Sequence, residues 1–282
     1  MDCTSELDTY SYLPLFMNKQ NMTLLKSMPQ MKLFRSDSPE YAAAFQTLLR
    51  STNERIYSKQ MLTQLLSSFS QDAIAVDWGA GTGELTRELL QQFSTVYAIE
   101  PHPELQNVLA QNCPAATVIP SGILEAHLPA LVDVGIMSHL LYYLPDETWG
   151  ETCLKAASLL TQQGILIVIL KHFTAGENQM FEAFGAARCD LSCVFNTFKR
   201  YPNYEVNFVS TLGRFQTKTF EETLEIARLM LGDRPRDSYH HLPTEAEFQA
   251  YVRQHFWDDT TQQGGWDCPQ QFLIIRRNPF YI

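Results

Sequence analysis

The sequence lacks an excess of positive charge, a long apolar run and a cysteine pair with metal-binding spacing. Its 282 residues contain 21 Lys and Arg against 31 Asp and Glu, which gives a formal net charge of −10. Contacts to nucleic-acid phosphates and to anionic membranes need Lys and Arg, so this balance argues against both as partners. It is compatible with a small cationic substrate.

The six cysteines are scattered and form no C-x-x-C motif, so we expect free thiols in a reducing compartment and no metal site. No run reaches the roughly 18 apolar residues that span a bilayer. The first six residues contain no basic or apolar signal segment. We therefore expect a cytoplasmic protein that is a monomer or a weak homodimer.

What the sequence does contain is a glycine-rich turn. The apolar run 73–76 is typical of a buried parallel strand, and the leucines at 85, 89 and 90 have helical spacing. Between them, Asp77-Trp78-Gly79-Ala80-Gly81-Thr82-Gly83 lets the backbone approach a ligand closely, while the following helix offers its N-terminal amides. The pattern predicts a strand, a ligand-binding loop and a helix.

The spacing of this loop separates it from two phosphate-binding motifs. The third glycine comes one residue too early for the dinucleotide fingerprint, and Glu84 stands where a P-loop has its Lys. A loop of the form D-x-G-x-G-x-G suits a nucleotide-like ligand that carries a cation, and Asp77 is expected to face the positive end. A second acid, Glu100, ends the apolar run 96–99 about 20 residues further on, where an acid can bind both ribose hydroxyls.

The stretch 76–83 together with Ile99-Glu100-Pro101 resembles motifs I and II of the S-adenosylmethionine-dependent methyltransferases with a Rossmann-like fold. The resemblance implies S-adenosylmethionine as the cofactor. In that fold the end of the third strand lies beside the adenine, although the family's usual acid is absent from this position here. The residues expected at the cofactor are Asp77, Gly79, Ala80, Gly81, Gly83, Glu100, Pro101, Gly122, Ile123 and Ser138.

Strand and helix patterns alternate along the chain. Apolar runs at 73–76, 96–99, 117–119, 131–141, 164–170, 206–209 and 271–275 predict strands, and helical spacing is found at 41–56, 61–70, 103–111, 147–160, 220–231 and 244–256. This predicts an α/β fold: a Rossmann-like, seven-stranded, mostly parallel sheet with helices on both faces. We expect a flexible tail or lid over 1–33, and a methyltransferase domain over 34–282 with an aromatic-rich substrate-binding insertion at about 173–205.

The carboxyl end of the fourth strand is where acceptor and methyl donor meet in this fold. His139 is the titratable side chain there, and a histidine can accept a proton near neutral pH. Tyr142 and Tyr143 offer aromatic faces to a cationic group. The alternatives are a structural histidine and a tyrosine pair that packs beneath a helix.

Across residues 34 to 276, motifs in the same order resemble the histamine N-methyltransferase family, which implies a small-amine N-methyltransferase. The family's substrate carboxylate falls on Glu54 and its N-terminal aromatic on Phe34. Two departures argue for an acceptor other than histamine. The family's substrate-contacting amide is His139 here, and its asparagine before the last strand falls near Asp267 and Cys268.

We expect direct in-line methyl transfer without a metal, in which the enzyme mainly positions the nucleophile. His139 is the first choice for the base that leaves a free lone pair on the amine, and Glu54 is the second. The alternatives are an O- or C-methyltransferase of a small aromatic or natural-product acceptor, a protein-methylating enzyme, and a non-catalytic binding module.

Overall fold

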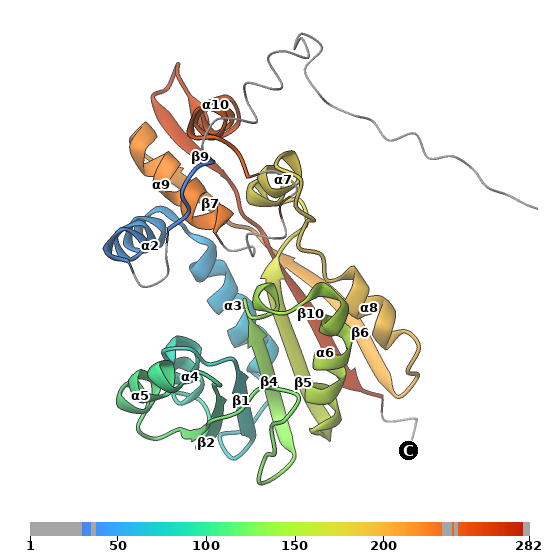
Figure 1. Ribbon diagram of the computed structural model, residues 1–282. Coiled ribbons are helices and arrows are strands. Elements are labelled where there is room, and N and C mark those ends of the chain that lie inside the picture. Colours follow the sequence, from blue (N-terminus) through green and yellow to red (C-terminus); the bar gives the residue numbers. More distant parts are fainter. Residues whose placement is uncertain (1–29, 35–37, 233–238, 240–241, 279–282) are drawn as a thin grey trace, which may run out of the picture.

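The computed structural model describes residues 30–34, 38–232, 239 and 242–278 (Figure 1). Its centre is a seven-stranded sheet in the order β3-β2-β1-β4-β5-β10-β6. The strands are β1 (Ile74–Trp78), β2 (Thr95–Ile99), β3 (Thr117–Ile119), β4 (Val132–Ser138), β5 (Leu160–Lys171), β6 (Tyr204–Thr211) and β10 (Gln270–Arg277). β10 pairs antiparallel with β5 and β6, and the other neighbours pair in parallel. The predicted α/β class is confirmed. The tail or lid predicted for 1–33 lies outside the described residues, except for 30–33.

Helices cover both faces of the sheet because successive side chains of a buried strand point to opposite sides. The odd-numbered residues from 165 to 169 in β5 pack with α3 (Glu54–Leu66) and α4 (Glu84–Leu89). The even-numbered residues from 166 to 170 pack with α6 (Trp149–Ser158) and α8 (Ser192–Phe198). The apolar run in this strand therefore reflects burial on two faces.

The strand order reverses at β1. This strand pairs in parallel with β2 on one side and with β4 on the other, so its last residue, Trp78, lies beside Met137 of β4. The connections from β1 and β4 leave the sheet in different directions, which opens a crevice at their carboxyl ends. Figure 1 shows α3 running past this edge of the sheet.

A second group of elements lies beyond the carboxyl ends of the strands (Figure 1). It contains a three-stranded sheet in the order β7-β9-β8, whose strands are Arg214–Thr217, Gln263–Asp267 and Trp257–Asp258. It also contains α2 (Pro39–Ser51), α7 (Gly176–Ala183), α9 (Phe220–Leu231) and α10 (Glu245–Phe256). Trp266 is at its core, with its ring 4.3 Å from that of Phe256 and 4.9 Å from that of Phe215. The sequence predicted α9 and α10 but not this small sheet.

The remaining described helices are α5 (Pro103–Asn112) and two short 3-10 helices, Leu141–Tyr143 and Asp146–Thr148. The predicted insertion at 173–205 contains α7 and α8. α8 packs on α6, whereas α7 contacts α9. Within the described ranges, no helix has the length and apolar character needed to cross a membrane.

The start of α10 provides a test of how this second group is held. The Thr244 hydroxyl accepts a hydrogen bond from the Glu247 amide, and the Glu247 carboxylate accepts one from the Thr244 amide at 2.8 Å. We expect Thr244→Ala to lower the free energy of unfolding by about 1 kcal/mol, because it removes this capping box. Urea denaturation measures the change. Thr63→Ala, at an exposed position within α3, is the matched control, and an equal loss in both variants would contradict the assignment.

Candidate functional site

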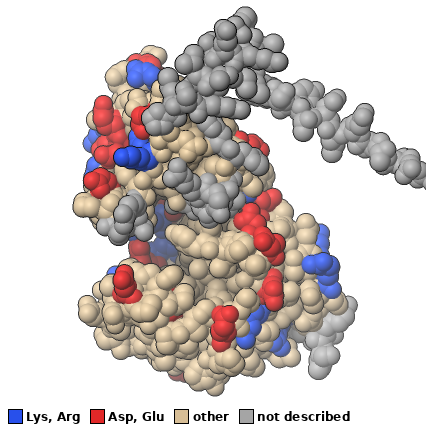
Figure 2. Space-filling model, in the orientation of Figure 1, with Lys and Arg blue, Asp and Glu red and all other residues tan. Residues whose placement is uncertain are grey.

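A cavity of about 400 Å³ lies at the carboxyl ends of β1 and β4. The loop after β1 and the segment after β4 form one side of it, and residues of α2, α3, β7 and α9 form the other. Figure 2 shows a hollow between the part of the molecule built on the central sheet and the second group of elements. Charged side chains of both signs lie inside it. The cavity is thus at the crevice that the strand order predicts.

The glycine loop has the backbone conformation that the sequence predicted. Gly79, Gly81 and Gly83 have φ values of 76°, 56° and 89°, a region that side chains with a Cβ rarely adopt. A Cβ at Gly83 would lie 2.7 Å from the Cys113 sulfur, so this glycine also allows α5 to pack closely. A Cβ at Gly81 would meet nothing within 4 Å. The backbone at Gly81 is therefore open to a ligand.

The carboxylate of Glu100 holds the backbone of this loop through hydrogen bonds. The side chain is buried, one carboxylate oxygen accepts the amide of Gly81 at 2.9 Å, and the other accepts the amide of His102 at 2.9 Å. Of the ten residues predicted at the cofactor, four line the cavity (Asp77, Gly79, Ala80 and Ser138) and six do not (Gly81, Gly83, Glu100, Pro101, Gly122 and Ile123). The direct cofactor contacts predicted for all ten remain predictions.

Asp77 is the buried acid beside the loop. Its carboxylate accepts a hydrogen bond from the Thr86 hydroxyl at 2.6 Å. Burial raises its pKa from 3.8 to about 6, and the nearby charge of Glu100 adds to the increase. A cationic ligand would offset the cost of burying this charge. Asp77, the open backbone at Gly81 and the absence of a P-loop lysine fit a cationic nucleoside such as S-adenosylmethionine.

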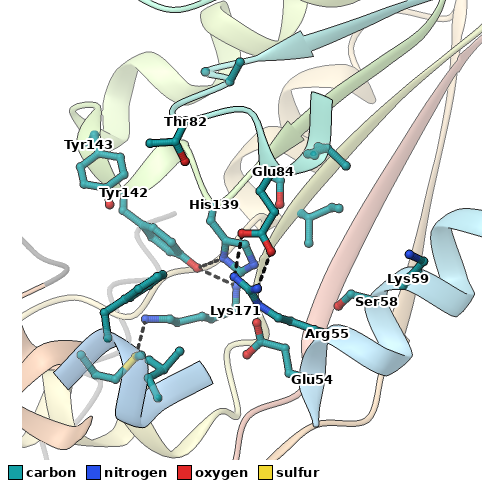
Figure 3. A pocket seen from close by; sticks show the side chains of 18 of the residues that line it. Glu54, Arg55, Ser58, Lys59, Thr82, Glu84, His139, Tyr142, Tyr143 and Lys171 are labelled. Atoms are coloured by element: carbon teal, nitrogen blue, oxygen red, sulfur yellow. Dashed lines mark hydrogen bonds and ion pairs between the residues drawn. The ribbon is translucent and has the colours of Figure 1, made fainter. Parts of the chain in front are cut away.

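The segment after β4 brings three predicted side chains to the cavity: His139, Tyr142 and Tyr143. His139 has a φ of 53°, and its Nδ1 lies 2.9 Å from the Tyr142 hydroxyl (Figure 3). Burial lowers the pKa of His139 to about 3, and the positive charges of Lys171 and Arg55 contribute. The imidazole is therefore neutral at physiological pH. Tyr142 is buried, whereas Tyr143 is 69% exposed.

The lining of the same cavity contains Glu54, which the sequence predicted, and two charged residues that it did not. Glu54 is the first residue of α3, and its carboxylate accepts a hydrogen bond from Gln270 at 3.1 Å. Glu177 of α7 is buried and accepts the indole N–H of Trp266 at 2.8 Å. Lys171, at the end of β5, is also buried, with its ammonium 5.1 Å from the centre of the Tyr142 ring.

Phe34 is outside the cavity lining. It packs against the core, and the guanidinium of Arg228 lies 5.8 Å from its ring centre. The aromatic side chains of α2 and β7 that line the cavity are Tyr41, Phe45 and Phe215. Substrate contact by Phe34 remains a prediction.

Two ion pairs join α3 to α4 along the wall of the cavity. Arg55 binds both carboxylate oxygens of Glu84, and one of these contacts is 2.8 Å long. One turn further on, Lys59 lies 3.3 Å from Glu88. All four side chains are exposed to solvent, so each pair stabilises the fold by less than about 1 kcal/mol.

The charge of the lining is negative overall. It contains five carboxylates (Glu54, Asp77, Glu84, Glu88 and Glu177) and three basic side chains (Arg55, Lys59 and Lys171). The carboxyl groups of the lining thus outnumber its basic side chains by two. The described part of the chain shows no group of three or more His, Cys, Asp or Glu residues that could hold a metal ion.

Comparison with known proteins shows that part of the chain is similar to methyltransferases. Residues 76–168 match the family model described as a methyltransferase domain. An uncharacterized methyltransferase of Exiguobacterium sibiricum is 30% identical over 122 residues, which cover 42% of this chain and 56% of the relative. One from Bacillus cytotoxicus is 30% identical over 93 residues, which cover 33% of this chain and 44% of the relative. The chain therefore spans about half the length of the curated relatives it matches.

Solved structures support the fold. A putative methyltransferase of Bacillus halodurans has a TM-score of 0.57 at 11% identity, and the match covers 78% of this chain and 98% of that one. The YcgJ protein of Bacillus subtilis has a TM-score of 0.56 at 11% identity, with coverage of 77% and 97%.

The raised pKa of Asp77 predicts a pH-dependent stability. An acid with a raised pKa stabilises the folded state below the unfolded pKa, 3.8, and this contribution is lost as the pH rises through about 6. Above pH 6 the loss amounts to at most about 3 kcal/mol. We expect Asp77→Asn to be more stable than the wild type in urea at pH 7.5, but not at pH 4, and to bind S-adenosylmethionine more weakly.

Asp72→Asn, at an exposed position before β1, is the control for this experiment and should leave both curves unchanged. Calorimetry measures the cofactor affinity of each variant. If Asp77→Asn and the wild type were equally stable at pH 7.5, burial of the Asp77 carboxylate would not lower the free energy of unfolding, and the assignment would be wrong.

The glycine loop predicts two different outcomes for one chemical change. Both Gly81→Ala and Gly83→Ala place a Cβ at positive φ, which costs about 1 to 2 kcal/mol. Gly83→Ala also brings its Cβ within 2.7 Å of Cys113 and Leu109, so we expect the greater loss of stability there. Gly81→Ala should mainly weaken cofactor binding, because its Cβ would meet no protein atom within 4 Å but would project from the loop that we expect to bind the cofactor. Greater stability of Gly83→Ala than of Gly81→Ala would contradict this assignment.

Proposed function

We propose that the chain uses S-adenosylmethionine to methylate a small molecule, preferably the nitrogen of a small amine, through the methyltransferase domain that residues 76–168 match. The cavity geometry is the main support. Its glycine loop and its carboxylates line one cavity of about 400 Å³ that is partly open to solvent, which suits a small acceptor.

The charges of the lining favour an amine. Glu54 and Glu177 line the same cavity as the glycine loop, and the excess of carboxylates attracts a cation. Both carboxylates are held by side-chain donors: Gln270 holds Glu54, and Trp266 holds Glu177. Their fixed positions would orient an ammonium group before it loses its proton.

Methyl transfer requires a free lone pair on the acceptor nitrogen. S-adenosylmethionine supplies a methyl group that its sulfonium already activates. The chain must hold the nitrogen about 3 Å from that carbon and in line with the bond that breaks. His139 is a weak proton acceptor at neutral pH because its pKa is lowered to about 3. Glu54 is therefore our choice for the group that receives the amine's proton.

The second candidate is O- or C-methylation of a flat acceptor. Tyr41, Phe45 and Phe215 supply aromatic surface to the same cavity and would stack on such a ring. A hydroxyl acceptor also needs a proton acceptor, so the two candidates differ in the acceptor atom and share the cofactor site.

The test combines binding and turnover. Calorimetry with S-adenosylmethionine and its demethylated product should show micromolar affinity, and a methyl-transfer screen across amines and phenols should give turnover on a small amine. Turnover restricted to phenols would support the second candidate. No binding of either cofactor form would overturn the proposal.

Glu54→Gln tests the acceptor site. We expect kcat/KM for the amine to fall by about 10- to 100-fold, because an amide neither balances an ammonium nor takes its proton. The calorimetric affinity for S-adenosylmethionine should stay the same. Glu151→Gln, at an exposed position on α6, is the matched control and should retain full activity. Undiminished amine turnover in Glu54→Gln would remove Glu54 from the mechanism.

A further inference from the structure

We infer that Arg55 binds the carboxylate of the cofactor's methionine part, and that the side chain of Glu84 occupies this position on Arg55 until the cofactor displaces it. Of the proposed function, this assignment needs S-adenosylmethionine as the cofactor. It depends neither on the methyl acceptor nor on the group that receives the acceptor's proton.

The first observation is the place of Arg55 in the cavity. Arg55 lines the cavity together with residues of the glycine loop, and its guanidinium binds both carboxylate oxygens of Glu84, with one contact of 2.8 Å (Figure 3). Glu84 directly follows Gly83 and is the first residue of α4. The charge of Arg55 also contributes to the lowered pKa of His139. The guanidinium is thus close to both segments that are expected to contact the cofactor.

The second observation is the charge of the lining compared with that of the cofactor. The methionine part of S-adenosylmethionine carries a carboxylate as well as two positive groups, the ammonium and the sulfonium. The excess of carboxyl groups in the lining favours the positive groups but repels the carboxylate. A carboxylate that loses its water in such a cavity needs a cation with matching hydrogen-bond donors. A guanidinium supplies them in a planar fork that fits both oxygens of one carboxylate.

The ion pair with Glu84 shows that Arg55 can bind a carboxylate in this way. The Glu84 side chain and the methionine part of the cofactor end in the same chemical group, so one can take the place of the other. The side chains of Arg55 and Glu84 are 45% and 60% exposed, and an ion pair that is open to solvent is weak. Water would solvate the released Glu84 carboxylate, and the exchange therefore costs little.

The other two basic side chains of the lining have different surroundings. Lys59 lies one helical turn further along α3, and its partner Glu88 lies one turn further along α4, away from the glycine loop. The ammonium of Lys171 is buried, 3.2 Å from the sulfur of Met230 in α9. Arg55, by contrast, is paired with the first residue after the glycine loop.

Calorimetric binding of two ligands to the full chain tests the assignment without turnover. S-adenosylmethionine and its decarboxylated form share the adenosine, the sulfonium and the amine, so the ratio of their affinities reports on the carboxylate. We expect the wild type to prefer S-adenosylmethionine by about 10- to 100-fold, the usual effect of one charge-assisted contact. In Arg55→Gln this preference should be lost. The affinity for the decarboxylated form should not fall, which shows that the variant is folded.

Glu84→Gln separates the exchange from a purely structural role of the ion pair. Loss of the competing carboxylate should raise the affinity for S-adenosylmethionine by up to about fivefold, the most that an exposed ion pair contributes. Arg253→Gln and Asp259→Asn are the matched controls, because they break a second exposed arginine–carboxylate pair that lies outside the cavity lining. Both controls should keep the wild-type affinities.

Each other outcome contradicts a separate part of the assignment. A ligand preference that persists in Arg55→Gln, or that is lost in Lys59→Gln instead, would show that Arg55 does not bind the carboxylate. Weaker binding of S-adenosylmethionine to Glu84→Gln would overturn the exchange. If the wild type bound both ligands equally, the assignment would be wrong while the cofactor stood. If it bound neither, the proposed function would fail as well.

Discussion

Each buried amide and carbonyl at the end of a strand needs a hydrogen-bond partner, and this requirement places much of the site. Beyond β2, the carboxylate of Glu100 accepts the amides of Gly81 and His102. Beyond β4, the phenol of Tyr142 accepts the amide of Lys171. The first of these side chains holds the backbone of the glycine loop, and the second lies 2.9 Å from Nδ1 of His139. The hydrogen bonds that complete the backbone therefore also fix residues of the glycine loop and of the cavity lining.

The buried charged side chains lower the stability of the fold, whereas they favour the binding of a charged ligand. An acid such as Asp77 would be better replaced by a neutral residue if only stability counted, as its raised pKa shows. Glu177 and Lys171 are likewise buried beside the cavity. Buried charged residues of this kind are typical of a binding site, where the fold is less stable but the site is complementary to charged ligands.

The sequence predicted the central sheet well because its signals are local. Apolar runs, the glycine turn and Glu100 define β1 and β2, and the helical spacing at 220–231 coincides with α9 (Phe220–Leu231). The sheet of β7, β8 and β9 was missed because its strands are short, and β9 contains two adjacent glycines. This small sheet is held by the packing of Trp266 against its neighbours. Lys171 directly follows the apolar run predicted as a strand at 164–170, a signal that could have placed it at the carboxyl edge of the sheet, where the ligand binds. Glu177 has no such signal, since only the tertiary fold brings α7 to the cavity.

The two ion pairs between α3 and α4 have a consequence for the order of events in the cavity. α4 begins directly after Gly83 of the glycine loop, and α3 begins with Glu54, the proposed proton acceptor. Arg55 and Lys59 link the two helices through exposed ion pairs. Any coupling that these pairs carry between a cofactor-driven shift of α4 and the position of Glu54 is limited to their strength, less than about 1 kcal/mol for each pair. By thermodynamic reciprocity, the acceptor would then change the cofactor's affinity by the same factor that the cofactor changes the acceptor's, which makes the pair of ligands heterotropic partners.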